Sequence, residues 1–335
     1  MMDRIRLHDY ELAVTGIGPI CSIGIGHDDF AASMVERLPA VGPSERLGDT
    51  GVYTDVAECW DFAVEDYLSS KKTYLDRCSE LVLAACALAL EDARLAGTQI
   101  DPTRLGLALG SAFGCLDSMT NHTARVQTKG LRFGSPMIFT HTMVNSPTAL
   151  AAIEYDVQGP LGTFAAGSIS AACALEFAAR RLRDGDADFM LVGGCDALST
   201  ALLRGLPRPE QIGADFVPGE GAAVLVLERG ETALNRGAAI HAYVGPMSLA
   251  VASDASPDAV LQKVAHRANL MPFPDVFCSP GTYGHTFGAC MALDLCAAIE
   301  QLRSQPGSDW LAIVGYSAPA SRTGPSAAVL VRSGT

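Results

Sequence analysis

Residues 159–173 constrain this chain more than any other stretch, and they read Gly-Pro-Leu-Gly-Thr-Phe-Ala-Ala-Gly-Ser-Ile-Ser-Ala-Ala-Cys. The small, apolar residues 163–166 favour a buried extended segment. Apolar side chains then recur at helical spacing over residues 169–183. Ser168 therefore falls on a tight bend from strand to helix, where Gly167 supplies backbone freedom. The first amides and the dipole of a helix favour negative charge, so such a bend suits a nucleophile or an anion.

An alternative without chemistry explains the same serine. Ser is a preferred N-cap residue, and Ser168 is placed to cap the helix that follows it. The local sequence does not separate a cap from a nucleophile. The choice depends on the rest of the chain.

Composition bounds the possible functions. The 335 residues are 49% hydrophobic, which is ample for a large core in one two-lobed unit or two domains. The net charge of −13 gives no electrostatic reason to bind nucleic acid or an anionic membrane. The ten cysteines show no Cys-x-x-Cys pair and no Cys/His metal spacing, so we expect reduced thiols in a cytoplasmic protein and no metal site. We expect no signal peptide and no transmembrane helix.

Strand and helix patterns alternate along the chain in two rounds. They predict a duplicated α/β architecture with two central sheets, divided into segments 11–237 and 238–335. Expected helices cover residues 28–37, 74–95, 232–236, 258–270 and 290–302. Expected strands cover residues 11–18, 188–194, 275–279, 310–316 and 327–331, with a strand into a glycine turn over 105–114 and a turn and strand over 216–228. The glycines of residues 16–21 match a dinucleotide-binding loop only in part, which is a weak signal.

Residues 159–194 resemble the nucleophile region of the β-ketoacyl-acyl-carrier-protein synthases, the ketosynthases of the thiolase superfamily. In that family a Gly-Pro precedes the nucleophilic cysteine by eight residues, and eight residues after Pro160 stands Ser168. The Ala-Ala-Arg, Gly-Asp-Ala-Asp and Gly-Gly segments that follow fall in step without a gap. Cys173 lies in an Ala-Ala-Cys-Ala segment that also resembles the family's nucleophile segment. Aligning Cys173 with the family's cysteine, however, requires an insertion before it and a deletion after it. We therefore reject Cys173 as the nucleophile.

The resemblance extends over nearly the whole chain, from about residue 11 to residue 331. Residues 216–228, a turn and an apolar strand, are its most specific single string. It implies an α/β, thiolase-like fold of two duplicated halves with central mixed sheets sandwiched by helices. It also implies a dimer, with residues 136–155 at the interface.

Three further residues are singled out. Glu220 lies between two glycines at the entry to an apolar strand, so it must pair with another group, and we expect a structural ion pair. The resemblance implies that Phe113 and Asn145 line a substrate tunnel or support its structure.

The catalytic set of the family is incomplete in this chain. A condensing ketosynthase uses a cysteine, two histidines and a lysine that supports one of them. Gly-His-x-x-Gly-Ala at residues 284–289 matches the motif of the second histidine, so His285 is the candidate. Pro280 stands where the lysine is expected, and no segment resembles the motif of the first histidine. A serine hydroxyl needs a base, which His285 supplies if its ring lies within about 3 Å, but no Asp or Glu is evident to complete a triad.

Four functions follow from this set. The first is a non-condensing subunit like the chain-length factors of polyketide, fatty-acid or aryl-polyene biosynthesis. It would act with an acyl carrier protein and with an active ketosynthase as heterodimer, or as a homodimer. The second is an acyltransferase that uses Ser168 and His285 on acyl-carrier-protein or acyl-thioester substrates. The third is a condensing enzyme whose first histidine comes from elsewhere, and the fourth is an unrelated binding module. The resemblance implies no cofactor, because a carrier protein holds the substrate on its phosphopantetheine.

Overall fold

The computed structural model describes residues 12–36, 40–48, 50–213, 215–250, 256–270, 274–277, 279, 281–304, 310–318 and 321–334. Some of the residues covered by the expectations above lie outside these ranges, among them Glu11, Arg37, Cys278, Pro280 and Thr335. The N-terminal segment 1–10 lies outside them as well.

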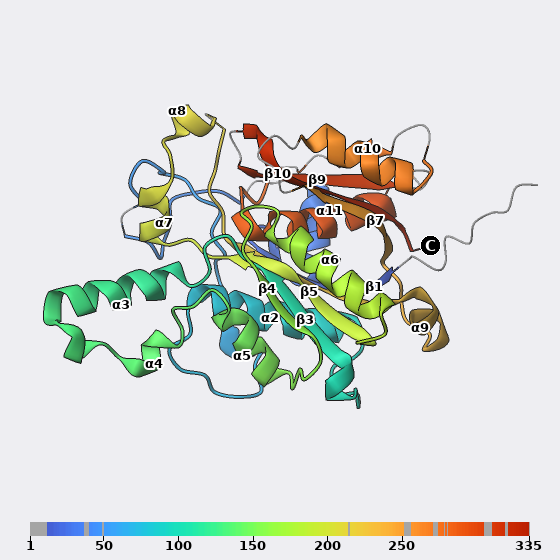
Figure 1. Cartoon of the computed structure of the whole chain (residues 1–335). Helices are drawn as coiled ribbons and strands as arrows, with labels where there is room; N and C mark the ends of the chain where they lie inside the picture. Colours follow the sequence, from blue (N-terminus) through green and yellow to red (C-terminus); the bar gives the residue numbers. More distant parts are fainter. Residues whose placement is uncertain are drawn as a thin grey trace, which may run out of the picture.

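One mixed sheet of ten strands runs through the molecule in the order β4-β3-β5-β6-β1-β7-β10-β9-β8, with β2 paired to β1 beside this path (Figure 1). The strands are β1 (Leu12–Cys21), β2 (Gly24–Ile25), β3 (Leu105–Gly110), β4 (Leu161–Phe164), β5 (Phe189–Asp196), β6 (Gly221–Arg229), β7 (Ala242–Ala250), β8 (Asp275–Val276), β9 (Leu311–Ala318) and β10 (Ser321–Ser333).

The helices connect and cover these strands. They are α1 (His27–Glu36), α2 (Arg77–Asp92), α3 (Leu116–Lys129), α4 (Pro136–Phe139), α5 (Ser146–Glu154), α6 (Ser170–Arg183), α7 (Thr200–Gly205), α8 (Pro209–Ile212), α9 (Gly230–Asn235), α10 (Pro257–Arg267) and α11 (Cys290–Ser304). Short 3₁₀ turns are η2 (Val64–Asp66), η3 (Pro102–Arg104), η4 (Leu131–Phe133) and η5 (Phe287–Ala289).

The strand order repeats between the two parts of the sheet. In the first part, β3 runs parallel to β4 and β5, while β5, β6 and β1 pair antiparallel. In the second part, β8 runs parallel to β9, while β9, β10 and β7 pair antiparallel. Along the strand path of the described residues the first part has five strands and the second has four, and β2 adds a further short strand to the first part. The repeat agrees with the expected duplication of an α/β unit, whereas the boundary between residues 237 and 238 stays a prediction.

The two sheets expected from the sequence form one continuous sheet. The join is short, because β1 bonds β6 along its length but pairs with β7 only over Leu12–Val14, opposite Val244, Tyr243 and Ala242. Such a contact between edges of two parts of the chain leaves no trace in local periodicity, so the sequence did not reveal it.

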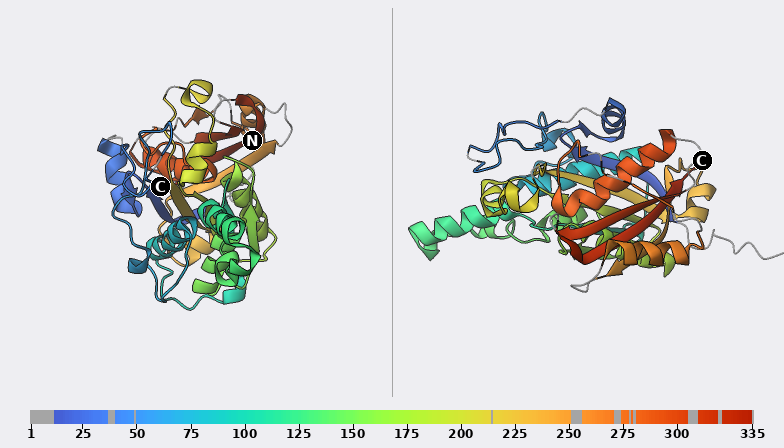
Figure 2. Two further views of the ribbon diagram at one scale, coloured as in Figure 1. Left: turned by 90° about the vertical axis from the view of Figure 1, so that its left-hand side faces the viewer. Right: turned by 90° about the horizontal axis from the view of Figure 1, so that it is seen from above.

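Helices cover both faces of each part of the sheet, which produces alternating layers (Figures 1 and 2). Helices α6 and α11 lie between the two parts and share one apolar core with both. Helix α2 packs on the outer face of the first part, and α10 packs on the outer face of the second. Strand β6 shows the consequence: Leu225 faces the inner core while Val224 and Val226 face α2. A strand buried on both faces reads as a continuous apolar run.

Most of the expected elements are confirmed, with shifted ends. The helix expected over residues 74–95 is α2, which begins after the N-cap Asp76, whose side chain accepts a hydrogen bond from Cys78 N. The strand expected over residues 275–279 is much shorter, because only Asp275 and Val276 pair with β9. No helix among the described residues combines the length and the apolar character needed to span a bilayer.

Helices α3 and α4 project from the body of the molecule as an arm (Figures 1 and 2). No residue of α3 is buried. Five large apolar side chains are exposed on the arm, namely Met119, Leu131, Phe133, Met137 and Phe139. An apolar arm of this kind is a candidate surface for contact with another protein.

Gly110 sets the distance between the end of β3 and the first turn of α6. A Cβ atom built on Gly110 would lie 2.3 Å from the backbone carbon of Ser170 and 2.4 Å from the nitrogen of Ala171. Gly110→Ala must therefore push α6 away from the sheet. We expect it to lower the free energy of unfolding, measured by urea denaturation, by at least about 1–3 kcal/mol.

Gly205→Ala is the matched control, because no atom lies within 4 Å of the Cβ position at Gly205. It should leave stability unchanged or raise it by up to about 1 kcal/mol, since alanine favours the helix. Equal effects of the two substitutions would show that the contact between β3 and α6 is not tight.

Candidate functional site

The bend between β4 and α6 is built by Ser170 rather than by Ser168. Gly167 adopts a positive φ of 61°, which brings the chain around into the helix. Ser170 Oγ donates to Gly167 O at 2.6 Å and accepts from Ala166 N at 2.8 Å. The N-cap residue is Ile169, which makes no side-chain capping bond. The interpretation of Ser168 as a helix cap is therefore wrong, and its hydroxyl faces another partner.

That partner is His285. Ser168 is only 6% exposed, and its Oγ lies 3.4 Å from His285 Nε2. Backbone pairing holds the histidine in place: its N–H donates to Val217 O at 2.7 Å, and its carbonyl accepts from Gly219 N at 2.9 Å. The structure thus brings together the two residues that the sequence predicted as catalytic, from positions 117 residues apart.

The second nitrogen of His285 fixes the direction of this hydrogen bond. Nδ1 accepts from the backbone N–H of Phe287 at 3.3 Å. A neutral imidazole that accepts at Nδ1 carries its proton on Nε2. Burial lowers the pKa of His285 to about 4, so the ring is neutral at pH 7. In this tautomer Nε2 donates to Ser168 Oγ and does not remove its proton.

Aromatic rings surround His285 and account for its burial. Phe216 and Phe287 lie with their ring centroids 5.3 and 5.0 Å from the imidazole centroid. Phe113 packs on Phe287 at 5.2 Å and is 39% exposed, so it lies at the rim of this aromatic group.

Asp196, at the end of β5, is a site residue that the sequence analysis missed. Its buried carboxylate accepts hydrogen bonds from Ser111 Oγ at 2.7 Å, Ala112 N at 2.8 Å, Phe113 N at 2.9 Å and Gly288 N at 2.7 Å. Burial raises the pKa of Asp196 to about 6, while the four donors act in the opposite direction. The signal was present, because an acidic residue after an apolar strand and Gly-Gly-Cys must find partners.

A cavity of about 750 Å³ opens beside Ser168 and His285. Cys290 lines it, but burial raises the pKa of this thiol to about 12, so it is a poor nucleophile. Asp294 also lines it and accepts from Tyr283 Oη at 2.5 Å, and burial raises the pKa of Asp294 to about 6. Among the described lining residues His285 is the one histidine, and there is no lysine or arginine. Cys173, on α6, is not among them.

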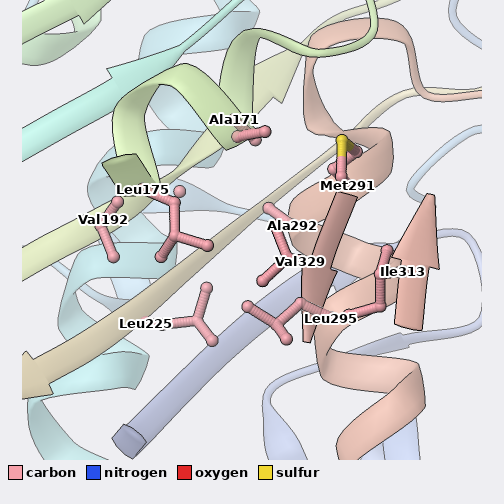
Figure 3. A pocket seen from close by; sticks show the side chains of 11 residues that line it. Ala171, Leu175, Val192, Leu225, Met291, Ala292, Leu295, Ile313 and Val329 are labelled. Carbon is pink, nitrogen blue, oxygen red and sulfur yellow. The ribbon is translucent and has the colours of Figure 1, made fainter. Parts of the chain in front are cut away.

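The core behind the bend leaves almost no space. Figure 3 shows side chains of α6 and α11 facing each other between β5, β6 and β9. The void between them is about 10 Å³, which is about one water-sized probe. Met291 and Ile313 line both this void and the larger cavity, so they form the wall between the two. An acyl chain therefore has no room in this core void.

Asn145 does not join this group. It precedes α5 on the exposed surface, its side chain makes no capping bond, and it is not among the residues that line the cavity. A role for Asn145 or Phe113 in a substrate tunnel stays a prediction.

Comparison with known proteins identifies the family. A family model described as the N-terminal domain of β-ketoacyl synthases matches residues 9–206. The chain belongs to the β-ketoacyl synthase family. A relative, 3-oxoacyl-[acyl-carrier-protein] synthase 2 of Coxiella burnetii, is 29% identical over 255 residues, which are 70% of this chain and 61% of the relative. The chain thus spans less than two thirds of the length of this relative.

Solved structures share the fold of this β-ketoacyl synthase family member. The ishigamide ketosynthase/chain length factor has a TM-score of 0.82 at 21% identity and covers 96% of this chain and 99% of that chain. A second structure is a type II polyketide synthase acyl-carrier protein in complex with its ketosynthase, bound to the hexaketide. Its matching chain gives a TM-score of 0.81 at 20% identity, and the alignment covers 97% of this chain and 99% of that chain. The thiolase-like fold expected from the sequence is confirmed.

Glu220 anchors the segment that pairs with His285. It is fully buried, with Oε2 2.8 Å from Arg46 Nη2 and Oε1 3.1 Å from Arg77 Nη2. Its oxygens also accept from the backbone N–H groups of Cys59 at 3.2 Å and Leu198 at 3.1 Å. This is the structural ion pair that its setting in the sequence indicated, and it holds the strand next to the Val217–His285 pairing.

Glu220→Gln keeps the shape of the side chain but removes its charge, leaving two arginines without their shared partner. We expect the free energy of unfolding to fall by about 1–3 kcal/mol, because Arg77 is only 14% exposed and loses a charged, fully buried partner. Arg46 is 34% exposed and keeps its ion pair with Glu58 at 3.0 Å, so it contributes less to the loss.

The control is Glu176→Gln, which breaks a surface pair with Arg180 at 2.9 Å and should cost less than about 0.5 kcal/mol. If urea denaturation showed similar losses of unfolding free energy in Glu220→Gln and Glu176→Gln, the structural role of Glu220 would be contradicted.

His285 should make stability fall at acidic pH. Its pKa drops from an ordinary value of 6.5 to about 4 on folding, so the unfolded chain binds more protons between these values. The contribution of neutral His285 to the free energy of unfolding is fully present above pH 6.5 and is lost as the pH falls towards 4. Between pH 7 and pH 5 we expect the stability difference between wild type and His285→Gln to shrink by about 2 kcal/mol.

The quantity to measure is the difference in free energy of unfolding between wild type and His285→Gln. Asp196 makes stability change with pH in the opposite direction, and it does so equally in both proteins. Its pKa rises to about 6 on folding, so its contribution falls as the pH increases towards 6. Parallel stability curves for wild type and variant would show that His285 is not buried as a neutral ring.

Proposed function

We propose that this chain is a non-condensing member of the β-ketoacyl synthase family, a subunit of the chain-length-factor type. It would pair with an active ketosynthase in fatty-acid or polyketide biosynthesis, including aryl-polyene systems. One observation carries the proposal: the hydroxyl of Ser168 faces an imidazole whose other nitrogen already accepts a hydrogen bond from Phe287 N.

The chemistry of the two side chains supports this function. A thiol with a pKa near 8.5 is brought towards neutrality at a helix N-terminus, whereas a serine hydroxyl needs an adjacent base. His285 is neutral at pH 7, and its lone pair points at Phe287 rather than at Ser168. No carboxylate takes part in orienting the ring in the contacts of His285 that the structure describes. Decarboxylative condensation also uses a second histidine and a lysine, and the described lining of the cavity has neither.

The proposed partners are an acyl carrier protein and an active ketosynthase. The names of two structural neighbours support them, one being a ketosynthase/chain length factor and the other a ketosynthase in complex with an acyl-carrier protein. The arm of α3 and α4, with five exposed large apolar side chains, offers a surface for a heterodimer or a homodimer. In this proposal the chain uses no catalytic cofactor, because the carrier protein holds the acyl group on its phosphopantetheine.

An acyltransferase that uses Ser168 and His285 is the second candidate. The 3.4 Å contact between Oγ and Nε2, beside a cavity of about 750 Å³, favours it. It requires the proton of His285 to sit on Nδ1, so that the hydrogen bond from Phe287 N is lost.

Mass spectrometry of the intact protein separates the two functions. We expect no acyl adduct on the wild-type chain after incubation with acyl-carrier-protein or acyl-thioester donors. Ser168→Cys should form a thioester adduct, because the thiol ionises far more readily than the hydroxyl. Each protein carries Cys290→Ala, so that the thiol in the cavity does not contribute, and the protein with Ser168 unchanged serves as the wild-type reference.

A wild-type adduct that disappears in Ser168→Ala would sink the non-condensing proposal and identify an acyltransferase. The absence of an adduct, in a chain that copurifies with a coexpressed active ketosynthase, would support the chain-length-factor type.

A further inference from the structure

Two histidines and an aspartate from distant parts of the chain meet on the side of the molecule where β1 joins β7. His27 begins α1, Asp92 ends α2 and His241 precedes β7. His27 Nδ1 lies 3.3 Å from Asp92 Oδ1, and His241 Nε2 lies 2.8 Å from Asp92 Oδ2. One potential ligand atom from each residue lies within 4.8 Å of the other two. None of the three lines the cavity beside Ser168.

The donor set suits a divalent transition metal. Imidazole nitrogens and a carboxylate oxygen bind zinc at about 2.0–2.2 Å, often with water as a fourth ligand. Ligand atoms at that radius in a tetrahedron lie about 3.3 Å apart. The contacts of 3.3 and 2.8 Å run to the two different oxygens of Asp92, and one potential ligand atom from each residue lies within 4.8 Å of the others. The side chains would therefore have to draw together around one metal to complete the site.

Further contacts hold each of the three residues. Glu300 Oε1 lies 2.9 Å from His27 Nε2, the nitrogen that faces away from Asp92. Histidine ligands commonly donate their second N–H to a carboxylate, which fixes the ring. Asp92 Oδ2 accepts from Ile17 N at 2.8 Å, and the backbone N–H of His241 donates to Val14 O at 2.9 Å.

One cation lies at the edge of this group. Arg303 Nη1 is 2.8 Å from His27 Nε2 and 3.1 Å from Glu300 Oε1. When Nδ1 binds a metal, Nε2 carries the proton and donates to Glu300, so Arg303 would keep its contact with Glu300 alone. Its side chain is 46% exposed and is free to make this shift.

We propose that His27, Asp92 and His241 bind a divalent transition metal of the zinc class, with Glu300 orienting His27. The metal has a structural role. It ties α1 and α2, from the first part of the chain, to the start of β7, next to the three-residue pairing that joins the two parts of the sheet. Ligand spacing along the sequence gave no metal motif, because these three ligands become neighbours only in the folded chain.

The test uses the full-length protein after removal of metal with a chelator, reconstituted with Zn²⁺ or Co²⁺ alone. We expect one metal per chain by elemental analysis, a rise in Tm with Zn²⁺, and visible absorption bands from Co²⁺ without thiolate charge-transfer bands. His241→Ala should abolish the binding, whereas His266→Ala, which removes an exposed histidine of α10, should leave it unchanged. Glu300→Gln should weaken binding about 10- to 100-fold while the three ligands remain.

Three results would overturn the proposal. The first is the absence of a Tm rise and of cobalt bands in the wild-type protein, which would leave the cluster as an ion-pair network. The second is equal binding by wild type and a folded His241→Ala variant. The third is a cobalt–thiolate band, which would place the metal on cysteines. If His241→Ala does not fold, the cobalt spectrum of the wild type and the affinity of Glu300→Gln decide the question.

Discussion

The buried carboxylate of Asp196 is the interaction on which the geometry of the site depends. Four donors converge on it, and they belong to the loop after β3 and to the turn after His285. A charge in the protein interior is stable only when such donors surround it, so the carboxylate fixes both segments against the end of β5. The close approach also requires Gly194, where a Cβ would lie 2.4 Å from Gly288 O.

This arrangement decides the character of the neighbouring histidine. The turn that Asp196 holds through Gly288 also presents the N–H of Phe287 to His285 Nδ1. Aromatic rings exclude water from the imidazole, which keeps it neutral, and the N–H that Phe287 donates to Nδ1 leaves the proton on Nε2. The side chain facing Ser168 is consequently a hydrogen-bond donor. A site built in this way can hold an oxygen atom of a ligand but is poorly suited to activate a hydroxyl.

Long-range packing supports the site from outside. Glu220 joins Arg46 and Arg77 to the strand that pairs with His285, and α6 lies close against β3 at Gly110. The core behind the bend is filled, with a void of only about 10 Å³ between α6 and α11. The space available to a ligand therefore lies on the other side of Met291 and Ile313, in the cavity bounded by α10 and β9.

The sequence by itself determined the strand-to-helix bend at Ser168, the family, the two candidate residues Ser168 and His285, and the need of Glu220 for a partner. Each of these follows from local patterns: glycine at a turn, helical periodicity, a charge at the entry to an apolar strand, and motifs of a few residues. Only the tertiary structure decided that Ser170 rather than Ser168 builds the bend, that His285 donates from Nε2, that Asp196 gathers four donors, and that β1 and β7 join the two parts into one sheet. The physical reason is the same in each case, because these contacts join residues that are distant along the chain or depend on which atom of a side chain finds a partner. Neither property leaves a periodic mark in the sequence.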